Sequence, residues 1–417
     1  MGSTTTSLRW ILVCVLAGHG LLHILGVVKG FGWDDVSQLT NPIGVVEGVV
    51  WLVAAALVLT AAVFLAVGAP TWWWAIALVA AVISQIAITS SWHDARAGTI
   101  VNLILLLAAG YGFAAEGPSS FHAQYRERAA HALADVSLSP AVLEEADLVD
   151  LPSPVAAHIR RSGALGQPRV VSFHADFHGR IRSGPDATWM PLTGQQVNTY
   201  GPRPQRIFLI DATRSGLPVT VMHVFADTTS TMRAKLLSLF TVVDASGPEM
   251  DRGETVTVFN DLVVMAPGAI VDAPVTWAAL DALHVRGEFT DGDQTISAVL
   301  TFNAEHDLVD FVSDDRTRAS ADGRTFTRHR WSTPLTGHHD SNGHRVFTLG
   351  KGVWDLGHSG GPFTYLELQL DSISYNVGDA QRRPRHRSPR RQPTAPAGDQ
   401  GVARNDDSAL VRRAAGA

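Results

Sequence analysis

Residues 10–28 read WILVCVLAGHGLLHILGVV, a run in which nearly every side chain is apolar. Three more apolar runs follow at residues 43–67, 72–91 and 99–115. Each is close to the roughly 20 residues that an α-helix needs to cross a hydrocarbon core about 30 Å thick. The sequence therefore predicts a membrane domain in residues 1–116 that folds as a bundle of four transmembrane helices.

A cleavable signal peptide is the alternative explanation for the first run, because such signals also place an apolar core after a basic start. Here a single basic residue, Arg9, precedes the run, and three further runs follow it. Tryptophans stand near the ends of the runs, where amphipathic rings favour the membrane interface: Trp10, Trp33, Trp72 and Trp92. The pattern favours four retained spans, and therefore a multi-pass protein that contacts the lipid bilayer.

The character of the chain changes at residue 151. Short segments that alternate apolar and polar side chains recur between Gly and Pro turns, most clearly at 295–302 and 365–373. Such alternation indicates antiparallel strands with one buried face. Two apolar stretches, at 231–244 and 254–267, are expected to be helices. We thus expect a soluble α+β domain in residues 151–377, with a curved, mainly antiparallel β-sheet.

Two segments flank this domain. Residues 117–150 mix alanines and charges in an amphipathic pattern, which predicts a helical connector near the membrane. Residues 378–417 are rich in Arg and Pro, with QRRPRHRSPRR at 381–391, and are predicted to be disordered. This basic tail is either simply solvated or attracted to anionic lipid head groups. The formal net charge of −6 for the 417-residue chain gives no indication of nucleic-acid binding.

Several motifs resemble an uncharacterised bacterial family of unknown function. They are LPSPV at 151–155, FNDLVVMAPGAIVD at 259–272 with Trp277 after it, and Tyr375–Asn376, together with HGLLHILG, SQLTNPIG and SWHDARAGTIVNL in the membrane part. The members of that family join a soluble domain of this kind to an N-terminal membrane region with four spans. The resemblance implies the same layout for residues up to about 377. It implies no activity and no catalytic residues.

The first candidate site lies among the predicted spans. His19 and His23 are four residues apart and so share one helical face. At 1.5 Å per residue, polar groups of all four helices fall within about 5 to 10 Å of the same membrane surface. The predicted cluster comprises His19, His23, Glu47, Gln85, His93, Asp94 and Asn102. Ionisable groups at such depth usually face the bundle interior and are functional hypotheses by default.

Three interpretations of this intramembrane polar cluster stay open. It is a hydrogen-bonded network that fixes helix packing, a metal or haem site, or a site that binds protons or a small solute. Two histidines and one carboxylate are not diagnostic of a metal. The cofactor is therefore unknown.

The soluble part offers three further candidates. Asn260 and Asp261 lie in an expected helix among apolar neighbours, so Asp261 is either a functional carboxylate or a hydrogen-bond anchor between helix and loop. Arg316 ends the sequence Ser-Asp-Asp-Arg, which is more typical of a charged turn than of an acid/base pair. His338 and His339 are adjacent in an expected strand and would point to opposite faces, which argues against a shared metal ion.

Motifs of catalysis are missing from the sequence. It contains no phosphate-binding loop, dinucleotide fingerprint or nucleophile elbow. Its single cysteine, Cys14, leaves no intramolecular disulfide and no cysteine metal site. Catalytic residues thus stay unknown, and the sequence favours a protein that is not an enzyme.

The distribution of basic residues predicts the orientation. Arg9, Arg126 and Arg128 flank the spans on the side of the N-terminus, whereas Lys29 and Arg96 lie in the opposite loops. Basic residues are in excess on the cytoplasmic side. We therefore expect a plasma (inner) membrane protein with both termini and the soluble domain in the cytoplasm.

The favoured function is non-enzymatic binding of a lipid or another apolar ligand, because a curved sheet over two apolar helices can enclose an apolar cavity. One alternative is a membrane oxidoreductase or a metal- or haem-binding enzyme that uses His19, His23 and Glu47. The other is a small transporter or sensor with a proton-linked site inside the membrane.

Overall fold

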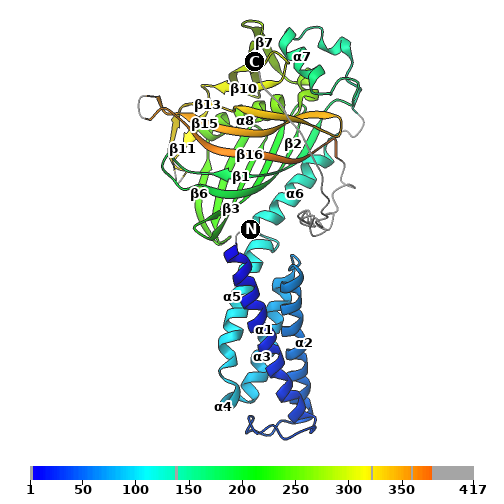
Figure 1. The fold of residues 1–417 in the computed structure, drawn as a ribbon, viewed down its shortest axis with the longest axis vertical. Coiled ribbons are helices and arrows are strands. Elements are labelled where there is room, and N and C mark those ends of the chain that lie inside the picture. The colour runs from blue at the N-terminus through cyan, green and yellow to red at the C-terminus, as the bar shows by residue number, and fades with distance from the viewer. Residues whose placement is uncertain (1–2, 137–139, 321–322, 358–359, 378–417) are drawn as a thin grey trace, which may run out of the picture. The chain divides into compact units, whose positions relative to one another are not determined.

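The computed structural model describes residues 3–136, 140–320, 323–357 and 360–377 (Figure 1). Its N-terminal part is a helical bundle, formed by α1 (Ser3–Gly30), α2 (Val45–Val67), α3 (Trp73–Ser90), the short α4 (Trp92–Ala95) and α5 (Gly98–Glu116). Four of the helical segments are long and apolar enough to cross a membrane: Arg9–Gly30, Val45–Val67, Trp73–Ser90 and Gly98–Ala134. The four predicted apolar helices are confirmed.

Glycines bring α1 and α2 into close contact. A Cβ atom placed on Gly30 would lie 2.5 Å from the Cα of Gly48, and one on Gly26 would lie 2.1 Å from the ring of Trp51. Small residues allow such backbone approach between helices in a membrane, where packing rather than the hydrophobic effect drives association. At the other end of the pair, the Arg9 guanidinium donates to the carbonyl of Ala66 over 3.1 Å, as expected for antiparallel neighbours.

Helix α6 (Phe121–Ala134) follows α5 after four residues. Ser120 caps it by accepting a hydrogen bond from the Ala123 backbone N–H. Its apolar face packs on strands of the sheet, and the buried cluster contains Phe121, Tyr125, Ala129, Ala132, Leu133, Val197, Ile207, Leu209 and Met222. The connector was expected to be helical over 117–150. The helix ends at Ala134, and among the described residues from there to 150 one short 3-10 turn, η1 (Glu145–Leu148), follows.

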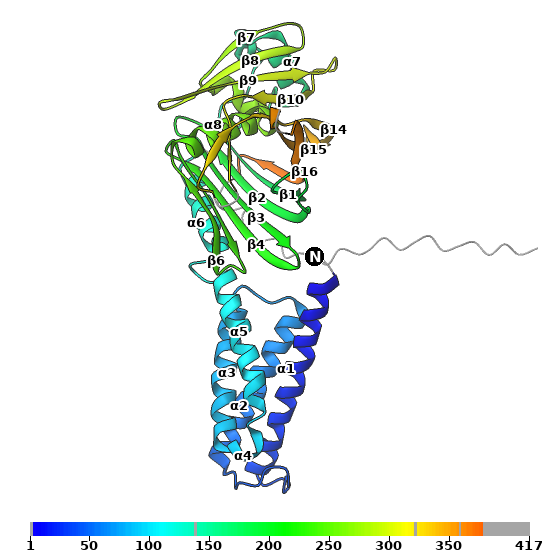
Figure 2. The same ribbon diagram turned by 90° about the vertical axis from the view of Figure 1, so that its left-hand side faces the viewer.

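The rest of the described chain is built on one open antiparallel sheet (Figure 2). The strand order is β6-β5-β4-β3-β2-β1-β16-β15-β13-β10-β9-β8-β7, with β14 paired to β15. The first six strands are β1 (Ser172–Ile181), β2 (Met190–Thr199), β3 (Gln205–Arg214), β4 (Leu217–Ala226), β5 (Thr229–Leu236) and β6 (Phe240–Ser246). The others are β7 (Val275–Ala279), β8 (His284–Asp291), β9 (Gln294–Phe302), β10 (Leu308–Ser313), β13 (Arg330–Ser332), β14 (Leu335–Ser341), β15 (His344–Asp355) and β16 (Pro362–Tyr375). A separate hairpin joins β11 (Thr317–Ala319) to β12 (Phe326–Arg328). Because β6 and β7 end the order, the sheet is not closed into a barrel, and the predicted antiparallel architecture is confirmed.

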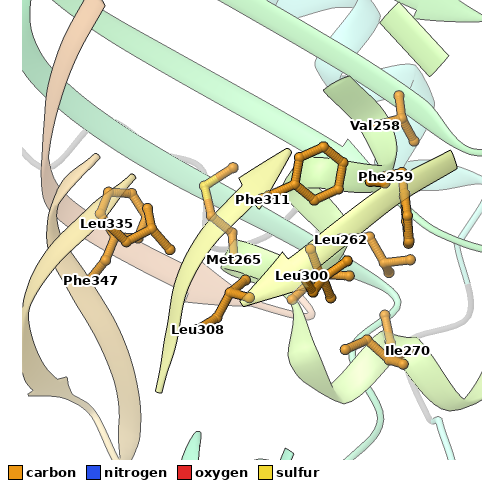
Figure 3. Close-up of a cluster of buried hydrophobic side chains, with 14 of the residues drawn as sticks. Val258, Phe259, Leu262, Met265, Ile270, Leu300, Leu308, Phe311, Leu335 and Phe347 are labelled. Atoms are coloured by element: carbon orange, nitrogen blue, oxygen red, sulfur yellow. The ribbon is translucent and has the colours of Figure 1, made fainter. Parts of the chain in front are cut away.

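Helix α8 (Pro248–Met265) lies within the curve of the sheet and is buried along most of its length. Figure 3 shows its side chains Phe259, Leu262 and Met265 among those of the sheet, including Leu300 and Phe311. The ring of Phe259 stacks on Phe289 at 5.4 Å and meets Phe311 edge-on at 5.4 Å. Each large apolar side chain removed from water contributes about 1.5–3 kcal/mol. Helix α7 (Ser153–Arg161) and the 3-10 turn η2 (Pro267–Asp272) complete the core.

One predicted helix is wrong. Residues 231–244 form most of β5 and β6, which pair in an antiparallel hairpin. The turn between them, at Leu237 and Ser238, contains neither Gly nor Pro, so the sequence gives no sign of the break. The other predicted helix, at 254–267, is confirmed as the greater part of α8.

The predicted disorder of residues 378–417, and their attraction to anionic lipids, lies outside the described residues. The boundaries that the sequence suggests between domains stay predictions.

Candidate functional site

A chain of hydrogen bonds joins polar side chains inside the helical bundle. Ser84 donates to Asn102 Oδ1 over 2.8 Å, and His23 Nε2 lies 2.7 Å from the Ser84 hydroxyl. His19 Nε2 lies 3.1 Å from both Ser84 Oγ and Asn102 Oδ1. The Asn102 amide donates to Gln85 Oε1 over 3.0 Å, and Gln85 donates to the Thr99 hydroxyl over 3.2 Å. The structure thus brings four of the seven predicted residues together: His19, His23, Gln85 and Asn102.

The local sequence positions this bundle cluster. His19 and His23 stand one turn apart on α1, and both are buried, at 6% and 2% exposure. A Cβ atom on Gly98 would lie 2.9 Å from His19 Cε1, so glycine at the start of α5 makes room for the imidazole. From α2 the cluster receives Trp51, whose ring lies 5.1 Å from that of His23.

One ring nitrogen of His23 takes no part in this hydrogen-bond network. When Ser84 donates to Asn102, His23 must donate from Nε2, which leaves its Nδ1 as an acceptor. Among the described residues that Nδ1 is buried without a hydrogen-bond partner, and so is the neighbouring Trp51 Nε1. Buried polar atoms are nearly always hydrogen-bonded. The acceptor of His23 and the donor of Trp51 are therefore the two atoms of the cluster at which a further polar group could bind.

Three predicted members lie elsewhere. Glu47 is exposed and accepts a hydrogen bond from the Gly44 backbone N–H, so it caps its own helix. His93 is exposed on α4. Asp94 accepts from the backbone N–H and hydroxyl of Thr40, and these hydrogen bonds lower the pKa of its carboxyl. The depth of a residue along a helix does not determine the direction in which its side chain points, and these three side chains point away from the cluster.

A network of charges anchors α8 to the sheet. Glu254 and Asp261 are seven residues apart and so lie on one face of α8. Arg206 of β3 reaches both carboxylates, from Nε to Asp261 over 2.7 Å and from Nη1 to Glu254 over 3.2 Å. Arg316 donates to the other oxygen of Glu254 over 3.4 Å. All four side chains are 4–11% exposed, so these ion pairs are shielded from water.

Neighbouring groups complete the charged network. Gln196 and Asn198 of β2 donate to Asp261 over 2.6 and 3.2 Å. The Arg316 guanidinium lies over the ring of Trp331 at 4.1 Å and donates to the Tyr365 hydroxyl over 3.1 Å. Two guanidinium groups thus balance two carboxylates, and the remaining polar atoms contact amides and aromatic rings.

Burial and pairing act differently on the two carboxyls. Burial raises the pKa of Asp261, although Arg206 opposes the shift. For Glu254 burial also disfavours the charge, but His223, Arg206 and Arg316 outweigh it and hold its pKa well below the usual range. Glu254 is therefore ionised wherever the protein is folded near neutral pH.

The soluble candidates differ from expectation in their partners. Asp261 joins α8 to strands β2 and β3, not to a loop. Asn260 donates to the Thr333 hydroxyl over 2.6 Å. Ser313 ends β10, and residues 314–316 connect it to β11, as expected for a charged turn. Within this connection Asp315 and Arg316 are turned inward, and Asp315 pairs with Arg252 over 2.7 Å. Within the described ranges, no three His, Cys, Asp or Glu side chains are grouped so that they could hold a metal ion.

The face of β2–β5 toward α8 changes character along the strands. Its polar residues, such as Arg206, Gln196 and His223, contact α8. Two apolar rows follow on the same face, one of Ile210, Val221 and Ala234 and one of Ala212, Val219 and Leu236, each aligned across β3, β4 and β5. In these apolar rows Val219, Val221 and Leu236 are only half-buried. Figure 2 shows β2–β4 continuing past α8.

A comparison with protein families matches residues 141–368, more than half of the chain, to DUF6544, a family of unknown function. The chain belongs to this family. The match to DUF6544 includes the whole charged network and both apolar rows, whereas helices α1–α6 lie outside it. No curated protein matches the sequence.

Two solved structures are similar to part of this chain. One is a putative outer membrane lipoprotein-sorting protein domain from Vibrio parahaemolyticus, with 10% identity, a TM-score of 0.32, and coverage of 54% of this chain and 92% of that one. The other is a DUF1329 family protein from Desulfovibrio piger, with 12% identity, a TM-score of 0.31, and coverage of 54% and 95%. Both likenesses are too remote to bear on function.

Proposed function

We propose that this protein is a membrane-attached binding module for an apolar ligand such as the acyl chain of a lipid. The observation that carries the proposal is the pair of apolar rows beyond α8. There, Val219, Val221 and Leu236 keep part of their surface exposed on the inner face of the sheet. A hydrocarbon chain that covers them removes apolar area from water, which is favourable by about 25 cal/mol per Å².

The position of the rows supports a ligand that comes from the bilayer. The rows lie on the same stretch of β3–β5 as Asp211 and Lys235. His122 hydrogen-bonds Asp211 over 2.9 Å, and Lys235 lies 4.6 Å from the Phe121 ring. Both partners belong to the start of α6, four residues after α5 ends. The open end of the rows thus lies at the membrane side, while the charged network closes the other end.

Binding is favoured over catalysis in this proposal. Glu254 and Asp261 are each paired with an arginine, so neither is left as a free base beside the apolar rows. The hollow lined by His158, Asp307 and His338 holds about 10 Å³, which is no more than one water. The proposed oxidoreductase is disfavoured because Glu47 lies outside the bundle cluster.

Photocrosslinking tests the proposal directly. The full chain in lipid nanodiscs would be irradiated with a fatty acid that carries a diazirine on its acyl chain, and the crosslinks located by mass spectrometry. We expect crosslinks on β4 and β5, reduced about tenfold in Val221→Asp, which corresponds to about 1.4 kcal/mol of binding free energy. Thr231→Asp, at an exposed position of β5, is the matched control. Crosslinks confined to α1–α5, or an unchanged yield in Val221→Asp, would contradict the proposal.

The bundle cluster supports a second candidate, a proton-linked site. The observation in its favour is the buried Nδ1 of His23, which has no hydrogen-bond partner in the described part of the chain and is placed to accept a proton. Proton flux would be measured with a pH dye inside liposomes under an imposed potential. We expect flux with the wild type and its loss in His23→Phe, with the exposed His93→Phe as control. Flux equal to that of protein-free liposomes would refute this function and leave the cluster a packing role.

We further propose that both termini and the sheet domain lie in the cytoplasm, with the protein in the plasma (inner) membrane. The support is the excess of Arg9, Arg126 and Arg128 over Lys29 and Arg96. Reporter fusions after residue 125 and in the 30–42 loop test this orientation. A translocated reporter at residue 125 would reverse it.

A further inference from the structure

Two neighbouring turns of the sheet expose large apolar side chains. The turn between β5 and β6 is followed by Leu239, Phe240 and Val242, which are 55%, 61% and 45% exposed. Leu217, after the turn between β3 and β4, is 45% exposed. The Leu237 backbone N–H donates to the Pro218 carbonyl over 2.8 Å, so the two turns form one surface. We call Leu217, Leu239, Phe240 and Val242 the apolar tip.

The backbone of the turn makes its sequence unusual. Leu237 and Ser238 both have positive φ, at 54° and 56°. Hairpin turns of this conformation favour Asn-Gly, because L side chains are disfavoured there. A turn that faced only water would gain from Asn-Gly in both conformation and solubility. Leucine at this place, beside exposed Leu239 and Phe240, points instead to a partner that accepts apolar side chains.

The chain fixes where the tip can lie. Phe121, the first residue of α6, packs under Arg233 at 5.3 Å and Lys235 at 4.6 Å. Lys235 is two residues before Leu237. Because α5 ends at Glu116 and α6 begins at Phe121, this part of the sheet is held within a few residues of the end of a membrane-crossing helix. Figure 2 shows the parts of β3, β4 and β6 that carry these turns on the side away from α8.

Charges around the tip suit the surface of a membrane. Arg214 stands just before the β3–β4 turn, and Lys235 and Arg233 precede the β5–β6 turn. Basic side chains beside exposed Leu and Phe are the combination with which peripheral segments enter the boundary between head groups and acyl chains.

We propose that the apolar tip inserts into the bilayer interface, with Arg214 and Lys235 against anionic head groups, so that the sheet domain is fixed on the membrane by a second contact besides α5. The tip continues the apolar rows at the end of the strands, because Phe240 pairs with Leu236 and Leu217 stands two residues before Val219. Its insertion nevertheless requires no ligand on the rows. If ligand crosslinking fails, the inference that the tip inserts still stands. If the tip does not insert, the proposed ligand binding still stands.

Depth measurement by spin labelling tests the insertion on the full chain in liposomes. Cys14 is the only native cysteine and would be replaced by Ala. A nitroxide at Phe240→Cys should have a ratio of oxygen to nickel-chelate collisions at least about threefold higher than one at Thr229→Cys, which lies exposed at the far end of β5. Adding anionic lipid to zwitterionic liposomes should raise the ratio at Phe240→Cys, and Leu239→Asp should lower it toward the control.

Each opposing outcome overturns the inference. A water-like ratio at Phe240→Cys in both kinds of liposome would mean that the tip does not insert. Dipolar broadening between labels would identify a second copy of the chain, paired through the edge strand β6, as the partner of the tip. Circular dichroism of each variant would confirm that the sheet is retained, so that a lost signal reports position and not unfolding.

Discussion

The bundle cluster and the charged network bury polar side chains by opposite means. Around His19 and Ser84 the hydrogen bonds join imidazole, hydroxyl and amide groups of different helices. Around Arg206, two guanidinium groups and two carboxylates meet at 2.7–3.4 Å. Both clusters hold helices in place, yet only the second uses formal charge.

The difference agrees with the proposed membrane location of the helical bundle. A full charge within a hydrocarbon core is costly even when it is paired, so transmembrane helices associate through neutral hydrogen bonds and small residues. A domain that folds from water can bury ion pairs if each charge is compensated. The contrast predicts that losing one member should cost much more in the charged network than in the bundle cluster.

Removing one charge from the network should give the largest effect. Arg206→Leu leaves Asp261 and part of Glu254 uncompensated, which should lower the free energy of unfolding of the sheet domain by about 3–5 kcal/mol. Denaturant titration of the full chain in detergent, followed by near-UV circular dichroism, measures it. Arg203→Leu is the control, because its side chain is 82% exposed and its ion pair is 3.7 Å long. Equal losses in both variants would show that the network adds nothing.

Acid should weaken the network next. The pKa of Glu254 is lowered in the folded state, so its contribution is complete above the unfolded pKa of about 4.3 and is lost as pH falls toward the folded value. Asp307, held by Arg345, behaves in the same way, with a pKa lowered to about 2. Glu254→Gln should flatten the acid limb of the stability curve, by on the order of 1–3 kcal/mol. An acid limb that is unchanged in this variant would contradict the assignment.

The bundle cluster should respond more weakly. Ser84→Ala removes hydrogen bonds to His19, His23 and Asn102, and interhelical bonds of this kind average about 0.6 kcal/mol, with a maximum near 1.7. Unfolding of the full chain in mixed micelles would be compared with that of Leu103→Ala, at a 55% exposed position of α5. A loss as large as that of Arg206→Leu would remove the distinction between the two regions.

A half-buried carboxyl whose pKa is raised should give the smallest effect, with the opposite sign. Burial raises the pKa of Asp310 to about 6. Its contribution is therefore complete below an unfolded pKa of about 3.9 and is lost as pH rises through 6. Asp310→Asn should remove this slope, which we expect to be about 1 kcal/mol or less because the side chain is only half-buried. If the free energy of unfolding of the wild type, relative to that of Asp310→Asn, rose between about pH 4 and 6, the assignment would be refuted.

The sequence predicts what depends on local pattern. The apolar runs predicted the four helices, and alternation predicted the strands at 295–302 and 365–373, which lie in β9 and β16. Alternation does not predict strand β2, because its inward residues Gln196 and Asn198 are polar, and they are polar because they bind Asp261. That dependence is visible only in three dimensions, where Asp261, 63 residues away from Asn198, reaches the strand.

The same holds for the candidate sites. His19 and His23 were found from their spacing, and Asn102 and Gln85 from their depth, but Ser84 proved to be the centre of the cluster. Arg206 could not be foreseen, since its partners come from another element of the fold. The one available signal was the seven-residue spacing of Glu254 and Asp261 in an apolar helix.

The contact between Gly30 and Gly48 has a consequence for how the chain can evolve. When two side chains fill a space together, a gain of volume at one site can be offset by a loss at the other, and the pair can drift by compensating steps. At this crossing both partners already have the smallest side chain, and a Cβ on either would meet the other backbone at 3.0 Å or less. Neither residue can become smaller to make room for the other. Single substitutions at either position are therefore not tolerated at this crossing unless one whole helix shifts.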